Sequence, residues 1–342
     1  MDHLNPNLFG GKRRKVNRAK ADDLLQPLLD GDRAALSKAI TLIESTAKAD
    51  QAEGNKLIQA CLPHAGNSIR IGITGLPGAG KSSFIEVFGL HLIEEGAKVA
   101  VLAVDPSSTL SQGSILGDKT RMEELSVHEK AFIRPSPTGN TLGGVNRRTR
   151  ESIILCEAAG YSHIIVETVG VGQSETAVHS LTDLFILVLL TGGGDDLQGI
   201  KRGVMELADL ILINKADGDN LDRAKRTRSE LAKAIHFLPP HPANWKTEVM
   251  PVSALEQMGI DSVWDKVQEY QQHCKENGYW QQKRNQQALF WFKSTLSAGV
   301  LQRIENDEEL QAQLSSLEAR IKASEIDPFF AAEQFLDQLF KA

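Results

Sequence analysis

The stretch GLPGAGKS, at residues 75–82, is the strongest indication of the fold in this sequence. It has the spacing G-x-x-x-x-G-K-S, in which glycines let the backbone turn its N–H groups toward phosphate oxygens. The stretch follows an apolar run at residues 69–75 and leads into a helical pattern at residues 81–95. Because a helix N-terminus carries positive partial charge, it adds to the attraction for phosphate. The sequence therefore predicts a phosphate-binding loop between a strand and a helix.

Two side chains of this loop have distinct expected roles. Lys81 is expected to reach the β- and γ-phosphates of a nucleotide, and the Ser82 hydroxyl to coordinate Mg²⁺. We expect the loop and the first turn of the helix to surround the phosphates together. The residues concerned are Gly75, Pro77, Gly78, Ala79, Gly80, Lys81, Ser82 and Ser83.

A second motif, NKAD at residues 214–217, ends another apolar run and indicates which base is bound. Guanine presents N1–H and N2–H₂ donors on one edge. The carboxylate of Asp217 can accept both, whereas adenine lacks this pair of donors. Asn214 is expected to support the loop, and the stem of Lys215 to lie over the purine ring. A backbone N–H that reaches guanine O6 is expected after the next apolar run, at Ser253, Ala254 and Leu255. The sequence thus predicts GTP and GDP as ligands.

Acidic residues at the ends of predicted strands indicate a Mg²⁺ site. Glu167 closes the apolar run at residues 163–168, and Gly170 follows three residues later, which is typical of γ-phosphate sensing. Asp105 ends another predicted strand, and ligands gather at the carboxyl ends of parallel strands. Asp118 is a weaker candidate, because a surface turn explains it equally well. The predicted metal-side residues are Ser82, Asp105, Asp118 and Glu167.

The residue after Gly170 predicts slow hydrolysis. Ras-like enzymes have a water-orienting Gln at this position, but this chain has Val171, and Gln173 lies two residues late. We therefore expect slow intrinsic GTP hydrolysis that a partner accelerates. A basic residue beyond the glycines at 192–194, either Lys201 or Arg202, is expected to supply charge at the transition state. The expected catalytic residues are Lys81, Glu167, Gly170 and Lys201.

Apolar runs alternate with helical patterns along the middle of the chain, which predicts an α/β fold. We expect strands at residues 69–75, 98–105, 131–135, 163–168, 184–190, 210–214 and 248–253. Continuous apolar strands are typical of a mostly parallel sheet flanked by helices. The expected fold is a P-loop NTPase with N-terminal and C-terminal helical extensions. Its expected parts are an arm and helices in residues 1–67, a GTPase domain in residues 68–258, and a helical segment in residues 259–342, either a cap or a dimer arm.

Composition narrows the function classes. The 342 residues are 41% hydrophobic and 24% charged, which is ordinary for a globular protein. A net charge of −6 argues against nucleic acid as a partner, and no apolar run is long enough to span a membrane. Three cysteines without a CxxC pair indicate neither a disulfide framework nor a zinc site. Because no apolar signal core is visible near residue 1, we expect a cytoplasmic protein.

Six segments together resemble the MeaB/ArgK family of P-loop GTPases. They are GITGLPGAGKSSFIE, VLAVDPSS, SPTGNTLGGVNRRTRE, VETVGVGQSE, GDDLQGIKRG and NKAD. The resemblance implies a GTPase chaperone that loads and protects a cobalamin-dependent acyl-CoA mutase, chiefly methylmalonyl-CoA mutase. It also implies a homodimer to which the C-terminal helices contribute. Among the residues, it implies Asp105, Asp118 and Glu167 as metal-side acids and Lys201 as part of a third switch loop.

Besides a non-hydrolysing scaffold, two other functions remain open from the residues. A nickel-type metallochaperone GTPase shares the fold class, but it needs Cys or His ligands near the switches. Here the nearest such residues are Cys156 and His163, with no paired partner evident. A small-molecule kinase could use the same phosphate-binding loop, but it would have little use for the guanine-selecting Asp217. Nucleotide preference separates the kinase, and stoichiometric Ni²⁺ binding separates the metallochaperone.

Overall fold

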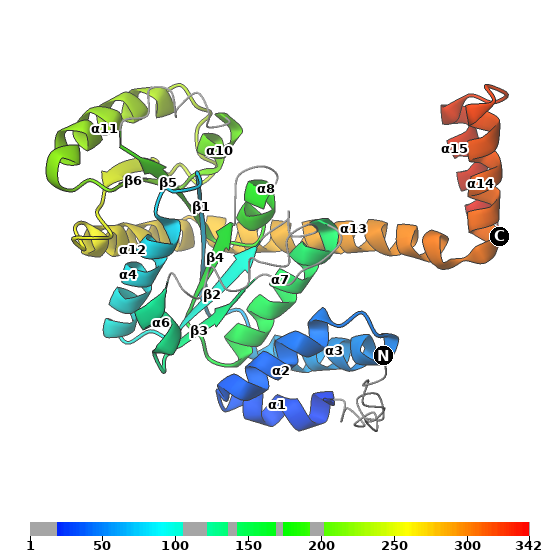
Figure 1. The fold of residues 1–342 in the computed structure, drawn as a ribbon, viewed down its shortest axis with the longest axis horizontal. Helices are drawn as coiled ribbons and strands as arrows, with labels where there is room; N and C mark the ends of the chain where they lie inside the picture. Colours follow the sequence, from blue (N-terminus) through cyan, green and yellow to red (C-terminus); the bar gives the residue numbers. More distant parts are fainter. Residues whose placement is uncertain (1–18, 105–121, 136–141, 169–173, 192–201, 342) are drawn as a thin grey trace, which may run out of the picture. The chain divides into compact units, whose positions relative to one another are not determined.

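The structure is a computed structural model that describes residues 19–104, 122–135, 142–168, 174–191 and 202–341 (Figure 1). The chain forms two compact units, Met1–Arg284 and Asn285–Ala342. The first unit contains a sheet and the helices around it, and the second is helical. The three-part division expected from the sequence stays a prediction.

Within the described residues, a seven-stranded sheet forms the centre of the first unit. Its strands are β1 (Ile69–Gly75), β2 (Val99–Val104), β3 (Ala131–Arg134), β4 (His163–Thr168), β5 (Leu184–Leu190), β6 (Leu210–Asn214) and β7 (Glu248–Pro251). Their order is β3-β2-β4-β1-β5-β6-β7, and all neighbours pair in parallel. The expected α/β fold with a parallel sheet is therefore confirmed.

Helices follow most of the strands, as the alternating pattern predicted. Those described in the first unit are α1 (Ala21–Leu29), α2 (Arg33–Glu44), α3 (Lys48–Cys61), α4 (Lys81–Glu94), α6 (Glu123–Val127), α7 (Leu142–Ala158), α8 (Ser174–His179), α10 (Arg202–Leu207), α11 (Leu221–Ile235) and α12 (Ile260–Glu276), with 3₁₀ helices η2 (Leu62–His64) and η3 (Gly218–Asn220). Helix α13 (Tyr279–Asn306) begins in the first unit and ends in the second. The sequence did not predict α6, because one short turn carries no periodic pattern.

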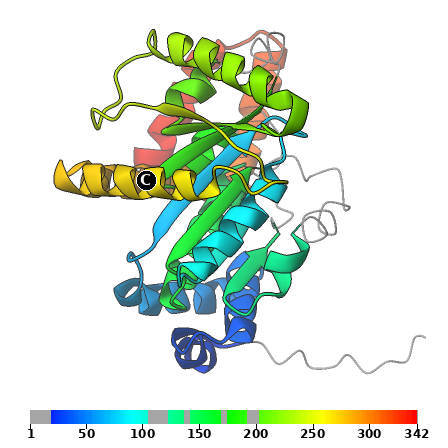
Figure 2. The same cartoon turned by 90° about the vertical axis from the view of Figure 1, so that its left-hand side faces the viewer.

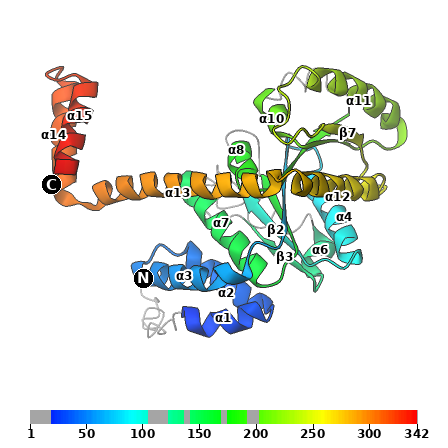
Figure 3. The ribbon, with the colours of Figure 1, turned by 180° about the vertical axis from the view of Figure 1, so that it is seen from behind.

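The two faces of the sheet are covered by different helices, because successive strand residues point to opposite sides. Helices α4 and α12 lie side by side on one face, over Ile71 and Ile186 (Figures 1 and 3). Helix α11 covers the other face, over Leu187 and Ile211. Burial on both faces explains why β5 and β6 are apolar at almost every position.

The three N-terminal helices pack against one another (blue in Figure 2) and against α7 (Figure 1). The Asp32 side chain caps α2 by accepting hydrogen bonds from the N–H groups of Ala34 and Ala35. An ion pair between Arg134 of β3 and Glu44 of α2 joins these helices to the edge of the sheet. The N-terminal helical extension is thus part of the first compact unit.

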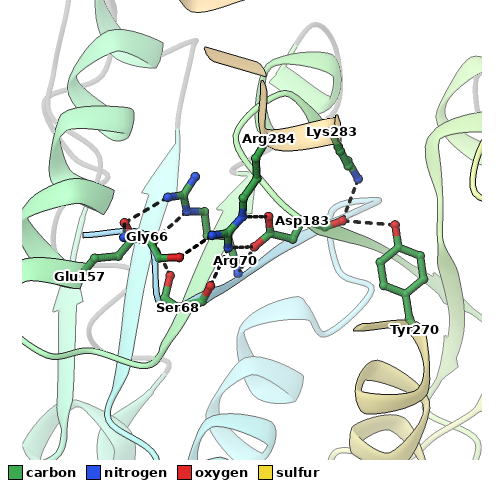
Figure 4. Close-up of polar contacts among 8 residues, drawn as sticks. All are labelled: Gly66, Ser68, Arg70, Glu157, Asp183, Tyr270, Lys283 and Arg284. Carbon is green, nitrogen blue, oxygen red and sulfur yellow. Dashed lines mark hydrogen bonds and ion pairs between the residues drawn. The ribbon is translucent and has the colours of Figure 1, made fainter. Parts of the chain in front are cut away.

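A buried polar cluster at the amino ends of β1 and β5 holds the second turn of α13 (Figure 4). Arg284 donates to both carboxylate oxygens of Asp183 at 2.7 Å and to the Ser68 carbonyl at 2.6 Å. Beside it, Arg70 of β1 donates to both carboxylate oxygens of Glu157, at 2.8 and 3.0 Å. These two pairs connect the starts of β1 and β5, the end of α7 and the start of α13.

Lys283 extends the same cluster toward β6. Its Nζ donates to the Asp183 carbonyl at 2.8 Å and lies 3.7 Å from a carboxylate oxygen of Asp209. Burial alone would raise the pKa of Asp209, but the charge of Lys283 and the hydrogen bond with His241 together hold that pKa below its usual value. Asp209 therefore stays ionised and keeps Lys283 in place.

The second unit consists of the rest of α13 together with α14 (Glu308–Lys322) and α15 (Pro328–Lys341), which pack against each other. Asp307 caps α14 by accepting from the N–H groups of Glu309 and Leu310. The C-terminal helical extension is confirmed, and a role for it in a dimer stays a prediction. No helix in the described ranges is long and apolar enough to cross a membrane. The cytoplasmic location also stays a prediction.

Candidate functional site

The loop between β1 and α4 has a backbone that only glycine fits at two positions. Gly75 has a φ of 151°, and a Cβ there would lie 2.0 Å from the carbonyl oxygen of Val188. Gly80 has a φ of 81°, and a Cβ there would lie 2.5 Å from Nδ2 of Asn214. The absence of side chains lets the loop approach β5 and the loop after β6. Its tip contains exposed Pro77 and Gly78, followed by buried Ala79.

Lys81 opens α4 and folds back over the loop. Its Nζ donates to the Gly75 carbonyl at 2.9 Å and to the Leu76 carbonyl at 3.3 Å. The residue is only 9% exposed, so its charge is held against the loop and away from bulk water. In a loop of this kind, the lysine supplies a positive charge to the β- and γ-phosphates.

Ser82 and Glu167 place two buried oxygen groups beside the carboxyl ends of β1 and β4. Ser82 Oγ donates to Glu167 Oε1 at 3.2 Å, and the two residues are 9% and 3% exposed. A hydroxyl and a carboxylate are the oxygen ligands that Mg²⁺ prefers, and it often takes few protein ligands plus phosphates. This pair therefore fits a Mg²⁺ ion that is shared with nucleotide phosphates.

Asn214 connects the loop after β6 to the phosphate-binding loop. Its Nδ2 donates to the carbonyls of Ala79 at 2.9 Å and Gly80 at 3.3 Å. Its Oδ1 accepts from the N–H of Ala254 at 3.3 Å. The residue is 1% exposed, so one buried amide fixes three loops relative to one another.

Asp217 lies in the wall of a pocket of about 650 Å³ next to the phosphate-binding loop. Ser253 Oγ donates to its Oδ2 and orients the carboxylate. Lys215 has a φ of 59°, a left-handed conformation that few non-glycine residues adopt, and its exposed side chain also lines the pocket. Leu255, which is 86% exposed, lines the same pocket. The pocket therefore contains the groups expected to bind guanine.

The structure brings together residues that the sequence places far apart. The pocket joins Gly80 and Ser83 of the phosphate-binding loop and α4 to the NKAD loop and to Ala254 and Leu255 after β7. Four other predicted site residues fall outside the described residues. These are Asp105, Asp118, Gly170 and Lys201. Their expected roles stay predictions.

Several pocket residues were not predicted from the sequence. Helix α4 contributes Val87 and Leu90, which follow the predicted Ser83 at intervals of four and three residues. That spacing puts them on one helix face, so the pattern could have been found by asking which face of α4 points away from the core. Asn220 and Gln257 have no such local signal, because they come from loops.

We expect Gly75→Ala to destabilise the loop more than Gly78→Ala does. Both glycines have positive φ, but a Cβ at Gly78 would meet no atom within 4 Å, whereas one at Gly75 would meet the Val188 carbonyl. Strain in sparsely populated backbone regions costs about 1–3 kcal/mol, and the clash adds to it in Gly75→Ala alone. Thermal melting of both variants checks this. Equal melting temperatures would show that the tight contact with β5 is unimportant.

A glycine-rich loop of this spacing after a central parallel strand, together with an NKAD carboxylate after β6, is typical of a P-loop GTPase. The matching family model, described as "Methylmalonyl Co-A mutase-associated GTPase MeaB", covers residues 36–309. The chain belongs to this MeaB family, and it is a GTPase that binds guanine nucleotide.

Individual relatives agree with this assignment. The chain is 46% identical to GTPase ArgK of Escherichia coli over 92% of this chain and 95% of that protein. It is 43% identical to the mouse "Methylmalonic aciduria type A homolog, mitochondrial" over 92% of this chain and 78% of that protein. A solved structure titled "LAO/AO transport system kinase" is 39% identical, with a TM-score of 0.76 and coverage of 95% of this chain and 99% of that one.

Proposed function

We propose that this GTPase is a chaperone for a cobalamin-dependent acyl-CoA mutase, namely methylmalonyl-CoA mutase, which it helps to load with its cofactor and to protect. The observation that carries the proposal is the family match over residues 36–309, whose description names that mutase. The name of the mouse relative, a methylmalonic aciduria protein, supports the same client.

The geometry supports an assignment of roles at the phosphates. Mg²⁺, when bound with GTP, would neutralise charge on the β- and γ-phosphates. Ser82 and Glu167 would hold it, because their oxygens already lie 3.2 Å apart. Lys81 would exchange its bonds to the loop carbonyls for bonds to phosphate oxygens. In this assignment Glu167 helps to bind Mg²⁺ and does not orient the attacking water.

Slow intrinsic hydrolysis is part of this proposal. Its support is Val171, which takes the place of the water-orienting Gln of Ras-like enzymes. A client mutase would then accelerate hydrolysis by changing the position of catalytic groups, with Lys201 proposed among them. Coupling of this kind lets GTP hydrolysis report that the client is bound.

GTP hydrolysis measured with and without purified methylmalonyl-CoA mutase tests the proposal. We expect the mutase to raise kcat at least several-fold. The γ-phosphate should be transferred to water and appear as free phosphate. An unrelated protein of similar size serves as the control. Tight GTP binding with no response to the mutase would refute the client while leaving the GTPase intact. Transfer of the γ-phosphate to an added small molecule would instead favour the kinase alternative.

Asp217→Asn is expected to change the preferred base from guanine to xanthine. Xanthine has a carbonyl where guanine has its amino group, so an amide at position 217 can accept from N1–H and donate to that carbonyl. A lost or gained pair of hydrogen bonds in such a site changes discrimination by about 1–3 kcal/mol. Competition of GTP and xanthosine triphosphate against a fluorescent nucleotide measures the change.

Asp219→Asn provides the matched control for this exchange. Asp219 lies on η3 just after the NKAD loop, is exposed, and does not line the pocket. The Asp219→Asn variant should therefore keep the preference for GTP over xanthosine triphosphate. If Asp217→Asn also keeps that preference, the base is read elsewhere.

The metallochaperone alternative receives less support from the structure. Cys156 is fully buried, and burial together with the charge of Glu157 raises the pKa of its thiol. Metal ligation requires the thiolate, which this environment disfavours. His163 packs its ring against Trp264 at 5.2 Å between centroids. These two side chains are therefore better explained as core residues than as nickel ligands.

The proposal includes a homodimer that uses the C-terminal helical segment in residues 259–342. Its support is a set of exposed apolar side chains on α13, each 54–64% exposed. They are Leu289, Phe290, Phe292, Leu296 and Leu301. Exposed apolar side chains at this density are typical of surfaces that another chain covers. A monomeric mass in solution at micromolar concentration would remove this part of the proposal.

A further inference from the structure

A groove on the first unit lies apart from the nucleotide pocket and shares no lining residue with it. It is lined by the carboxyl half of α11, the loop at residues 236–247, the start of β7 and one side of α12. Its volume is about 1650 Å³, whereas small-molecule pockets typically measure about 300–1,000 Å³. The groove is therefore of a size that suits a stretch of polypeptide.

The wall of the groove is held rigidly by hydrogen bonds. Trp245 Nε1 donates to the Asp209 carbonyl at 3.0 Å, and its ring packs edge-on against Tyr270 at 5.2 Å between centroids. His241 Nε2 lies 2.7 Å from a carboxylate oxygen of Asp209, and the ring of His273 bonds the loop through the Ala243 carbonyl at 2.8 Å. A wall already fixed in place loses little entropy when a ligand binds.

The groove also offers apolar contact. Ile235 and Leu238 are half-buried, while Phe237 is 78% exposed beside them. A large aromatic ring left in water at the edge of a preformed groove is a feature of protein-binding surfaces.

Four cations line the groove (Arg228, Lys233, Lys246 and Lys266) together with three carboxylates (Glu206, Glu248 and Glu269), so the net charge of the lining is +1. Lys266 is neutralised by Glu248 at 2.9 Å and by Glu269. Three other cations, Arg228, Lys233 and Lys246, are exposed and form no ion pair with any described residue. The whole chain has a net charge of −6, so these three cations are opposite in sign to the net charge of the chain. A ligand of negative charge would meet complementary charge at these three side chains.

We propose that this groove binds an acidic, extended segment of a partner protein, with an apolar side chain packed against Phe237. Carboxylates of the segment pair with Arg228, Lys233 and Lys246. A polypeptide fits the apolar contact at Phe237 better than nucleic acid does, because a nucleic-acid backbone has no apolar side chain to pack against that ring. This surface is additional to the proposed mutase function and requires no particular client.

Fluorescence anisotropy with a labelled peptide tests the proposal on the full chain. The probe is a fluorescein-labelled peptide of alternating Glu and Asp with a central Phe-Leu pair. A peptide with Lys in place of each acid is the counter-probe. We expect saturable binding of the acidic probe, weakened by salt, and no binding of the basic one. Failure of the acidic probe to bind would overturn the proposal.

Two charge-matched double variants locate the binding site. Arg228→Glu with Lys233→Glu reverses two groove cations and should weaken the acidic probe about tenfold or more, because like charges then face each other. Arg223→Glu with Arg226→Glu makes the same change of charge on the same helix outside the groove, and should weaken binding much less. Equal weakening by both variants would mean attraction by general charge only, which contradicts the proposal.

A third variant, Phe237→Ser, tests the apolar contact without altering charge. It should weaken the probe while leaving the salt dependence of binding as it was. Stronger competition by duplex DNA or by phosphatidylserine vesicles than by unlabelled peptide would overturn the choice of a polypeptide. Basal GTP hydrolysis should be unchanged in all these variants, so a failure here is distinguishable from a failure of the GTPase assignment.

Discussion

Lys81→Ala is expected to lower the rate of GTP hydrolysis by about 10²–10³-fold, the usual cost of removing one preorganised group that stabilises transition-state charge. The structure gives the reason for so large an effect. Lys81 is 9% exposed and held at 2.9 Å from the Gly75 carbonyl, so its charge is already fixed at the loop expected to surround the phosphates. Phosphate release and nucleotide affinity, measured separately, distinguish lost catalysis from lost binding.

Lys98→Ala is the control for that measurement. Lys98 precedes β2, is exposed, and lies outside the nucleotide pocket. It should hydrolyse GTP at the rate of the unaltered chain and melt at the same temperature. If Lys81→Ala retains more than a tenth of the original rate while folded, the phosphate-binding role assigned to this lysine is wrong.

Arg284→Ala is expected to destabilise the first unit by about 3 kcal/mol or more, because breaking a buried ion pair leaves an uncompensated charge. Asp183 would lose two hydrogen bonds of 2.7 Å, and its side chain is only 2% exposed. The Ser68 carbonyl would lose its 2.6 Å donor as well. For a unit that spans Met1–Arg284, such a loss lowers the melting temperature by roughly 5 °C, because the entropy of unfolding is about 2.1 cal/mol/K per residue.

Two comparison variants make the prediction sharper. Arg284→Lys keeps the charge but cannot reproduce the planar fork that contacts Asp183 and Ser68 together, so its loss should be intermediate. Arg320→Ala removes an arginine from α14 in the second unit and should change the melting temperature little. A stable Arg284→Ala variant would show that the cluster at the start of α13 contributes little to the fold.

The sequence predicted strands best where both faces of the sheet are buried. The bounds of β1, β4, β5 and β6 agree with the prediction, because continuous apolar runs end where burial ends. The strand expected at residues 248–253 stops at Pro251 instead. Ser253 turns away and pairs with Met258 in an isolated bridge, a tertiary preference that the apolar pattern does not contain.

Residues of the site could be named from motifs, but their mutual contacts could not. The spacing of GLPGAGKS and NKAD identified Lys81 and Asp217 as residues of interest, because each motif has a local chemical logic. The pair of Asp183 and Arg284 is separated by 101 positions, and no periodicity connects them. The same limit applies to the groove beside Phe237, which exists only when α11, α12 and β7 have come together.

The order of strands in the sheet has a consequence for how this chain is made. The neighbours of β1 are β4 and β5, so the strand that leads to the phosphate-binding loop leaves the ribosome long before either partner. Ile71 pairs with Ile165 on one side and with Leu184 on the other. Long-range parallel pairing is slow, and unpaired apolar strands of nascent chains are prone to aggregate. Until translation has passed Leu190, β1 has an open edge, and synthesis of this GTPase therefore includes an interval in which it needs protection itself.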